Sequence, residues 1–150
     1  MSEIKYYEIL AIRPEYVDGT GDCTEIIYES GETYITERTI NSFMNTMAYY
    51  FNTDLRANRY NYGNKLGIKN NVPIVLSDKY ILVPYKARKP WNKKDGAYGY
   101  INLFNYLDLH EGKEDNYILT TEGIKLRLRE RVASFKRRVI FSRLLITERR

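Results

Sequence analysis

The sequence predicts an α+β fold built mostly from antiparallel strands, with one internal helix and one C-terminal helix. Along most of the chain, short β-branched and aromatic segments alternate with turn residues, a pattern typical of hairpins. Only two segments, about 39–51 and about 130–147, have the length and apolar spacing of helices. The chain has 150 residues, of which 43% are apolar, so we expect one domain over residues 1–150 with its own core.

The N-terminal third predicts a strand followed by a hairpin. The apolar run YYEILAI, residues 6–12, is the first strand, and Pro14 with the Asp-Gly pair at 18–19 is expected to end it in a turn. Two alternating segments follow in CTEIIYESGETYITE, residues 23–37, around the Ser-Gly pair at 30–31. This stretch therefore predicts a β-hairpin.

The clearest helix signal comes next. Apolar residues recur at helical spacing from Ile40 to Phe51, and Thr39 is suited to cap the N-terminus. The segment after this helix, residues 52–67, is rich in Asn, Gly and Arg. We expect it to be a polar loop.

The second half predicts further strands and the terminal helix. Residues 74–83 predict a hairpin that turns at 77–78, and residues 100–109 with 116–128 supply two or three more strands. Turns are expected at Gly112 and Gly123. In the last helix the apolar stripe is formed by Val132, Phe135, Val139 and Ile146, with Lys136 and Arg143 on or beside it. These cations either reach outwards from the packed face or point at a ligand.

Charge is distributed unevenly along this basic chain, which has a net charge of +5 and a pI near 9.2. Acidic residues dominate the first 32 positions, whereas Lys and Arg dominate from Gly123 onwards and in the loop KARKPWNKK, residues 86–94. Such polarity indicates an anionic partner for the basic part. The alternative is a solvated basic face that binds nothing.

Several function classes lack the residues that they need. One cysteine and one histidine exclude an intrachain disulfide and any standard structural zinc site, and no phosphate-binding glycine motif is present. We expect no enzyme, no metal and no cofactor. A magnesium-dependent nuclease, using carboxylates such as Asp18, Asp22 and Glu25, is the alternative among enzymes. Neither a signal peptide nor a membrane-spanning run is apparent, so a cytoplasmic protein is expected.

Duplex DNA is the anionic partner that the basic segments favour, because cations gain affinity by displacing counterions from phosphates, and arginine also enters narrow minor grooves. Two asparagines are candidates for hydrogen bonds to base edges, whereas Trp91 and Tyr98 are expected to brace the basic loop rather than to intercalate. The candidate DNA contacts are Arg56, Asn58, Arg59, Lys86, Arg88, Lys89, Asn92, Lys93, Lys94, Arg137, Arg138 and Arg143.

The order of segments resembles the ComK family, the competence transcription factors of Gram-positive bacteria. The similarity starts at YEILAIRPEYVDGTGDCTEIIYESGETYI and continues through INSF, RANRYNYG and PIVLSDKYILVPYKARKPW to NYILTTEGIKLRL and SFKRRVIFSRL, from about Tyr7 to Leu144. The sequence departs from the family at Val83-Pro84-Tyr85-Lys86, in the place of Trp91, in the missing glycines of RANRYNYG, and in lacking a longer C-terminal tail.

This resemblance implies a transcriptional activator of competence that binds AT-rich duplex DNA through the minor groove. It also implies a homodimer or a dimer of dimers on DNA, association with the nucleoid, contact with RNA polymerase, and capture by the MecA adaptor of a Clp protease. The resemblance supports DNA binding more than transcriptional activation, because the C-terminal tail implicated in activation is absent from this sequence. A protein-interaction module that has lost DNA binding is a further alternative.

Overall fold

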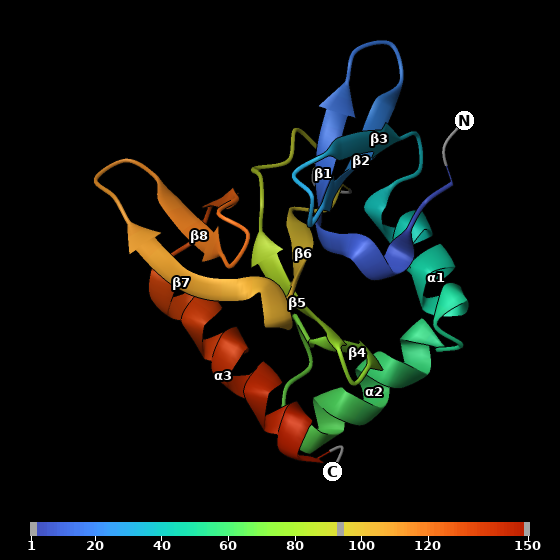
Figure 1. The fold of residues 1–150 in the computed structure, drawn as a ribbon, viewed down its shortest axis with the longest axis vertical. Helices are drawn as coiled ribbons and strands as arrows, with labels where there is room; N and C mark the ends of the chain where they lie inside the picture. Colours follow the sequence, from blue (N-terminus) through green and yellow to red (C-terminus); the bar gives the residue numbers. More distant parts are fainter. Residues whose placement is uncertain (1–2, 93–94, 149–150) are drawn as a thin grey trace.

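The computed structural model describes residues 3–92 and 95–148, and within them the chain forms nine strands, three α-helices and two 3-10 turns (Figure 1). The elements are η1 (Tyr6–Glu8), β1 (Ile9–Val17), β2 (Gly21–Tyr28), β3 (Thr33–Thr36), α1 (Ile40–Tyr50), α2 (Leu55–Leu66), β4 (Ile74–Ser77), β5 (Tyr80–Lys86), β6 (Tyr98–Asn102), η2 (Leu103–Asn105), β7 (Tyr106–Glu111), β8 (Asn116–Thr120), β9 (Lys125–Leu128) and α3 (Val132–Glu148). The α+β prediction is confirmed.

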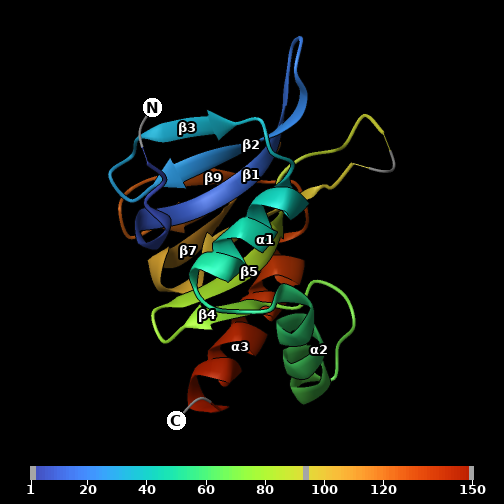
Figure 2. The same cartoon turned by 90° about the vertical axis from the view of Figure 1, so that its right-hand side faces the viewer.

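The strands form two antiparallel sheets. The larger sheet has the order β3-β2-β1-β6-β5-β4, and the smaller one has the order β7-β8-β9. Helix α1 lies on one side of the large sheet, the small sheet and α3 lie on the other, and α2 lies at the rim beside β4, where it contacts both cores (Figures 1 and 2). The large sheet is therefore the middle layer, and both of its faces are covered.

Two apolar cores follow from this layering. On the α1 side, Phe43 and Met47 pack with the strand residues Ile12 and Leu82. On the other side, Phe135 of α3 packs with Ile81 and Val83 of β5 and with residues of the small sheet. Side chains alternate along β5 between the two cores because successive residues of a strand point to opposite faces. The second core draws on residues from Leu10 to Leu145.

The middle of the large sheet requires a glycine at one point. Gly99 of β6 lies opposite Tyr85 of β5, whose ring is fully buried. A Cβ atom at position 99 would lie 2.4 Å from the carbonyl oxygen of Ile12 and 3.2 Å from the Tyr85 ring. Only glycine allows β1, β6 and the Tyr85 side chain to approach so closely.

The outer edge of β4 is closed by one side chain of α2. Asn58 is buried, and its side-chain amide donates to the carbonyl oxygen of Val75 at 2.6 Å and accepts from the N–H of Val75 at 3.1 Å. The amide thus makes the two hydrogen bonds that a neighbouring strand would make. Because these backbone groups are buried, they need such a partner.

The end of β5 is closed in a similar way by the start of α3. Glu130 accepts a hydrogen bond from the N–H of Lys86 at 2.8 Å, and Arg138 donates to the carbonyl oxygen of Pro84 at 2.7 Å. The two charged side chains also pair with each other, with one contact at 2.9 Å. The N–H of Arg129 donates to the carbonyl oxygen of Lys86. Proline fits this edge because it has no N–H that would need a partner.

Most predicted elements are present with small shifts. The helix expected at about 39–51 is α1, and the one expected at about 130–147 is α3. The hairpins at 23–37 and 74–83 form, and Gly123 has a positive φ in its turn. Four strands, not two or three, follow the basic loop. Within the part of the chain that the structure describes, no helix is both long and apolar enough to cross a membrane.

Two local predictions are wrong. Strand β1 does not stop at Pro14 but continues to Val17. Beyond Ile12 it pairs with β2 alone, so its other side makes no backbone hydrogen bonds that Pro14 could disrupt. Residues 52–67 are not a loop but contain α2, which Asp54 caps through the N–H of Ala57 at 2.9 Å. The helix ends at Gly67, whose φ is +70°.

The edge cap by Asn58 predicts a specific loss of stability. In an Asn58→Ala variant both backbone groups of Val75 lose their partner, so the free energy of unfolding should fall by about 2 kcal/mol. Urea unfolding followed by circular dichroism measures the change. Asn64→Ala, at an exposed position of the same helix, is the control, and equal losses in the two variants would contradict the cap.

Candidate nucleic-acid interface

The basic loop between β5 and β6 is held against the β1–β2 hairpin by Tyr16. The Trp91 ring stacks on the Tyr16 ring with centroids 4.0 Å apart and planes 2° apart. The Tyr16 hydroxyl donates to the carboxylate of Asp95 at 2.7 Å and accepts from the backbone N–H of Trp91 at 2.9 Å. Burial and the hydrogen bond to Asp95 raise the pKa of Tyr16, so its hydroxyl stays protonated at neutral pH. The expectation that Trp91 braces this loop agrees with these contacts.

Arg88 lies beneath the loop and not on its surface. Its guanidinium carbon is 4.1 Å from the Tyr16 ring centroid, so it lies on the ring face opposite Trp91, because both partners cannot occupy one face at that distance. One terminal nitrogen is 2.8 Å from the carboxylate of Asp22, and Nε donates to the carbonyl oxygen of Gly96 at 2.8 Å. Only 7% of Arg88 is exposed. Its charge is neutralised inside the protein.

Helix α2 presents two of the predicted arginines. Arg56 is exposed, and Arg59 is half-buried and donates to the Tyr100 hydroxyl at 3.1 Å. The helix contains no acidic residue between its first and last positions, and its exposed Lys65 adds to its positive charge. α2 therefore has a basic outer side, from which the Arg59 side chain reaches β6.

Helix α3 divides its three candidate arginines among different surroundings. Arg138 is 9% exposed and serves the β5 edge, and its guanidinium carbon is 5.4 Å from the centroid of the Tyr98 ring. Arg137 is exposed and lies near the ring of Phe141, which is on the same helix. Arg143 is exposed and lies over Tyr106 of the small sheet. Arg143 thus belongs to a different side of α3 from Arg138.

The three basic segments nevertheless meet around two tyrosines of β6. Tyr98 and Tyr100 are two residues apart on one strand and so point to the same face. Arg59 of α2 reaches Tyr100, Arg138 of α3 reaches Tyr98, and Lys86 lies opposite Tyr98 in the register. Segments that are far apart in the sequence therefore converge at one end of the β5–β6 pair.

The structure changes the set of residues that remain candidates for DNA contact. Asn58, Arg88 and Arg138 are buried and interact with other parts of the protein, so their selection as contacts is corrected: Asn58 binds the backbone of Val75, Arg88 pairs with Asp22, and Arg138 binds the carbonyl oxygen of Pro84. Lys93 and Lys94 lie outside the described residues. Half-buried or exposed candidates are Arg56, Arg59, Lys86, Lys89, Asn92, Arg137 and Arg143.

Sequence reasoning did not assign roles to the residues that position this surface. Tyr16 braces the loop, Glu130 holds Arg138 in place, and Tyr100 binds Arg59. In the sequence they look like an ordinary strand tyrosine, an acidic residue before a helix and another strand tyrosine. No local signal distinguishes them, because each acts on a partner that is distant in the chain.

The residues considered for a nuclease or a reactive thiol have other surroundings in the part of the chain that is described. Within residues 3–92 and 95–148, no three His, Cys, Asp or Glu side chains lie close enough to hold a metal ion. Asp22 and Glu25, considered for a nuclease, pair with Arg88 and Arg13. Cys23 is buried in the large sheet, and burial raises the pKa of its thiol, which keeps it in the unreactive protonated form.

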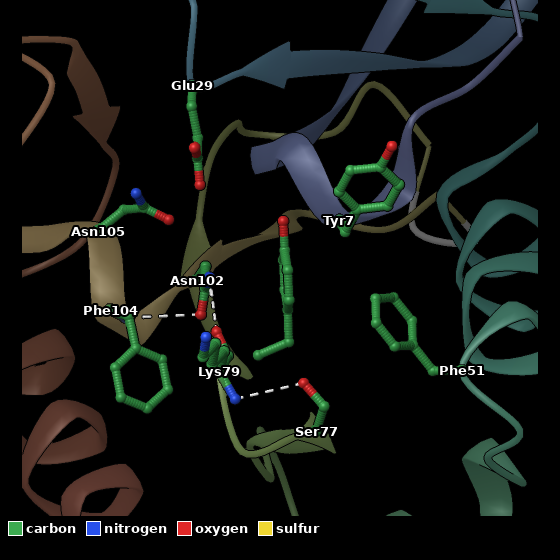
Figure 3. A pocket seen from close by; sticks show the side chains of 9 residues that line it. Tyr7, Glu29, Phe51, Ser77, Lys79, Asn102, Phe104 and Asn105 are labelled. Atoms are coloured by element: carbon green, nitrogen blue, oxygen red, sulfur yellow. Dashed lines mark hydrogen bonds between the residues drawn. The ribbon is translucent and has the colours of Figure 1, made fainter.

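A hollow of about 610 Å³ lies between η1, the β4–β5 turn and η2 (Figure 3). Tyr7 and Phe51 lie on one side of it, and Phe104 and Asn105 lie on the other. The amide of Asn102 is used by backbone groups: it accepts from the N–H of Phe104 and donates to the carbonyl oxygen of Lys79. The hollow therefore offers mainly ring surfaces, and it is not lined by any of the candidate DNA contacts.

The contacts of Tyr16 predict how the basic loop loosens. Tyr16→Phe keeps the ring stack but removes two hydrogen bonds, so the free energy of unfolding should fall by about 1 kcal/mol. The backbone N–H of Trp91 should exchange with solvent roughly tenfold faster, because it loses its acceptor. Hydrogen exchange by NMR measures this directly. Tyr49→Phe, at a residue that is 83% exposed, is the control; an unchanged exchange rate at Trp91 would show that the hydroxyl does not hold the loop.

Neighbouring arginines of α3 should differ sharply in their structural importance. Arg138→Met leaves Glu130 buried without its counter-charge, which should cost about 3–5 kcal/mol of stability. Arg137→Met changes an exposed side chain and should cost less than about 0.5 kcal/mol. Thermal and urea unfolding of the two variants test this contrast, and similar losses would refute the assigned role of Arg138.

Comparison with known proteins yields no relative for this chain. No protein-family model matches it. No curated protein matches it, and no solved structure does. The likeness to the ComK family therefore stays an interpretation of the sequence.

Proposed function

We propose that this protein binds duplex DNA with the basic surface formed by α2, the β5–β6 loop and the first turns of α3. The observation that carries the proposal is the convergence of these segments on Tyr98 and Tyr100. The contacts that we propose are Arg56, Arg59, Lys86, Lys89, Asn92 and Arg137, all half-buried or exposed.

Charge in these segments supports an anionic partner. Neither α2, nor the described loop residues 87–92, nor α3 as far as Ile146 contains Asp or Glu. Glu130, at the base of α3, is paired with Arg138, and Asp22, beneath the loop, is paired with Arg88. These two carboxylates are thus matched by buried arginines, whereas Asp95 of the same loop accepts a hydrogen bond from the Tyr16 hydroxyl and Asp54 caps the first turn of α2. Such a surface attracts phosphates without reading a sequence.

Preorganisation of the loop also favours binding. Stacking on Tyr16 and the ion pair beneath it fix the part of the loop that carries Lys89 and Trp91. A loop that is already ordered loses less conformational entropy when it meets a ligand. Trp91 remains 80% exposed while stacked, so its outer face is available to a sugar or a base.

Selectivity for AT-rich DNA and a role as a transcriptional regulator are finer proposals. They rest on the resemblance to the ComK family, as do a dimer on DNA, association with the nucleoid, RNA polymerase contact and delivery to a protease by MecA. A cytoplasmic location is proposed from the sequence, in which neither a signal peptide nor a membrane-spanning run is apparent. Arginine on a narrow minor groove is the physical basis for AT preference. Arg56 and Arg59 on α2 are the side chains that we propose for it.

Salt dependence and charge reversal test DNA binding together. Fluorescence anisotropy with a labelled duplex should give a slope of about −5 in log K against log salt if about six phosphates are neutralised. Arg56→Glu and Lys89→Glu should each weaken binding by roughly 1 kcal/mol or more and flatten the slope by about one. Neither residue is buried, so the fold should be retained.

Lys113→Glu is the matched control, because it makes the same charge change at an exposed position in the β7–β8 turn, away from α2 and the basic loop (Figure 1). Equal effects at positions 56, 89 and 113 would mean that only net charge matters and would remove the proposed surface. Equal affinity for AT-rich and GC-rich duplexes would remove the AT-selective proposal and leave phosphate binding intact.

A further inference from the structure

Strand β3 is an open edge of the large sheet. It pairs with β2 on one side, and Figure 2 shows it at the rim of the sheet. The N–H of Tyr28 donates to the carbonyl oxygen of Glu32, so Glu32 points its backbone groups towards β2. Backbone direction alternates along a strand, so Thr33 and Ile35 point theirs outwards. Within residues 3–92 and 95–148, no other strand pairs with this outer side.

The opposite rim of the same sheet is treated differently. There, Asn58 binds the outward backbone groups of Val75, and Glu130 and Arg138 bind those at the end of β5. Proteins commonly protect exposed edges because an unprotected one pairs with another chain. No comparable side-chain cap is present on Thr33 or Ile35 among the described residues.

We propose that β3 pairs with β3 of a second copy of this chain, antiparallel and centred on Ile35. Only outward-facing residues can exchange backbone hydrogen bonds across the new ladder, which places Ile35 opposite either Ile35 or Thr33 of the partner copy. The Ile35-centred register brings Glu32 opposite Arg38 of the partner copy, and the two-fold symmetry creates this pair twice. Both residues are exposed, and the Arg38 guanidinium also donates to the hydroxyl oxygens of Ser42 and Thr46 on α1, at 3.4 and 3.3 Å. The strand is therefore complementary in charge to itself in this register and not in the alternative one.

Side chains along the edge fit this partner. Ile35 is 45% exposed and Tyr34 is 37% exposed, although both belong to a β-strand. A hollow of about 870 Å³ adjoins them and is also lined by Glu3, Ile4, Thr36, Glu37 and Arg38. The two Ile35 side chains would pack on each other across the axis. Because β3 has only four residues, the interface is small, and we expect a dimer with a micromolar dissociation constant. The inference does not rest on DNA binding.

Disulfide trapping tests the register. Opposed residues of a hydrogen-bonded antiparallel pair have Cα atoms about 5.5 Å apart, within the range of a disulfide. Ile35→Cys should therefore give a covalent dimer under mild oxidation. Thr33→Cys, on the same face, should not, because the two copies of residue 33 would lie about 13 Å apart along the strands. The unmodified chain, whose only cysteine is buried, should stay monomeric in the same gel.

A charge swap tests the same interface without cysteine. In sedimentation equilibrium, Glu32→Arg and Arg38→Glu should each weaken dimerisation by about tenfold, because each places like charges opposite one another twice. The double variant restores both pairs and should recover affinity to within about threefold. A monomer at all concentrations up to about 0.5 mM, trapping through Thr33 instead of Ile35, or a double variant weaker than either single variant would overturn the proposal.

Discussion

Backbone hydrogen bonding at the edges of the large sheet is the constraint on which the rest of this structure depends. Strand β4 is the last strand of the sheet, so its outer backbone groups have no neighbouring strand. Because β4 is also short, the end of β5 has no neighbour on that side either. Asn58 and the Glu130–Arg138 pair take its place. Each unsatisfied buried group would cost about 1–3 kcal/mol, so these side chains outweigh any single surface contact in the free energy of folding.

The same side chains decide where the basic surface lies. Asn58 ties α2 to β4, and Arg138 ties α3 to β5, so the arginines next to them in sequence, the half-buried Arg59 and the exposed Arg137, are held at fixed places. Arg59 immediately follows the buried Asn58, and Arg137 immediately precedes the buried Arg138. Polar residues within one basic segment thus divide into those that hold the segment and those that face solvent. Composition counts them alike, although their roles are opposite.

Patterns that act locally could be predicted from the sequence. The apolar stripe of α1, the Ser-Gly and Glu-Gly turns and the alternating strands all depend on neighbours within a few residues. Helix α2 was missed because it buries only Leu55, Asn58 and Gly63 and has no apolar stripe, although Asp54 and Gly67 are good caps. The burial of Arg88 could not be predicted, because its partners Asp22 and Tyr16 lie on another hairpin.

In the proposed dimer, the positions of β3 and β4 at opposite rims of the large sheet determine where the two basic surfaces lie. Paired residues of neighbouring strands point to the same face, so an Ile35-centred pair has its two-fold axis perpendicular to the joined sheet. Both copies then carry α1 on one common side, with α2 at the outer rims. β3 and β4 are opposite rims of the sheet, so α2 of each copy lies far from the axis. Two basic surfaces would thus share one side of the dimer with the acidic N-terminal hairpins between them, an arrangement that favours two separated contacts on one duplex over a single continuous one.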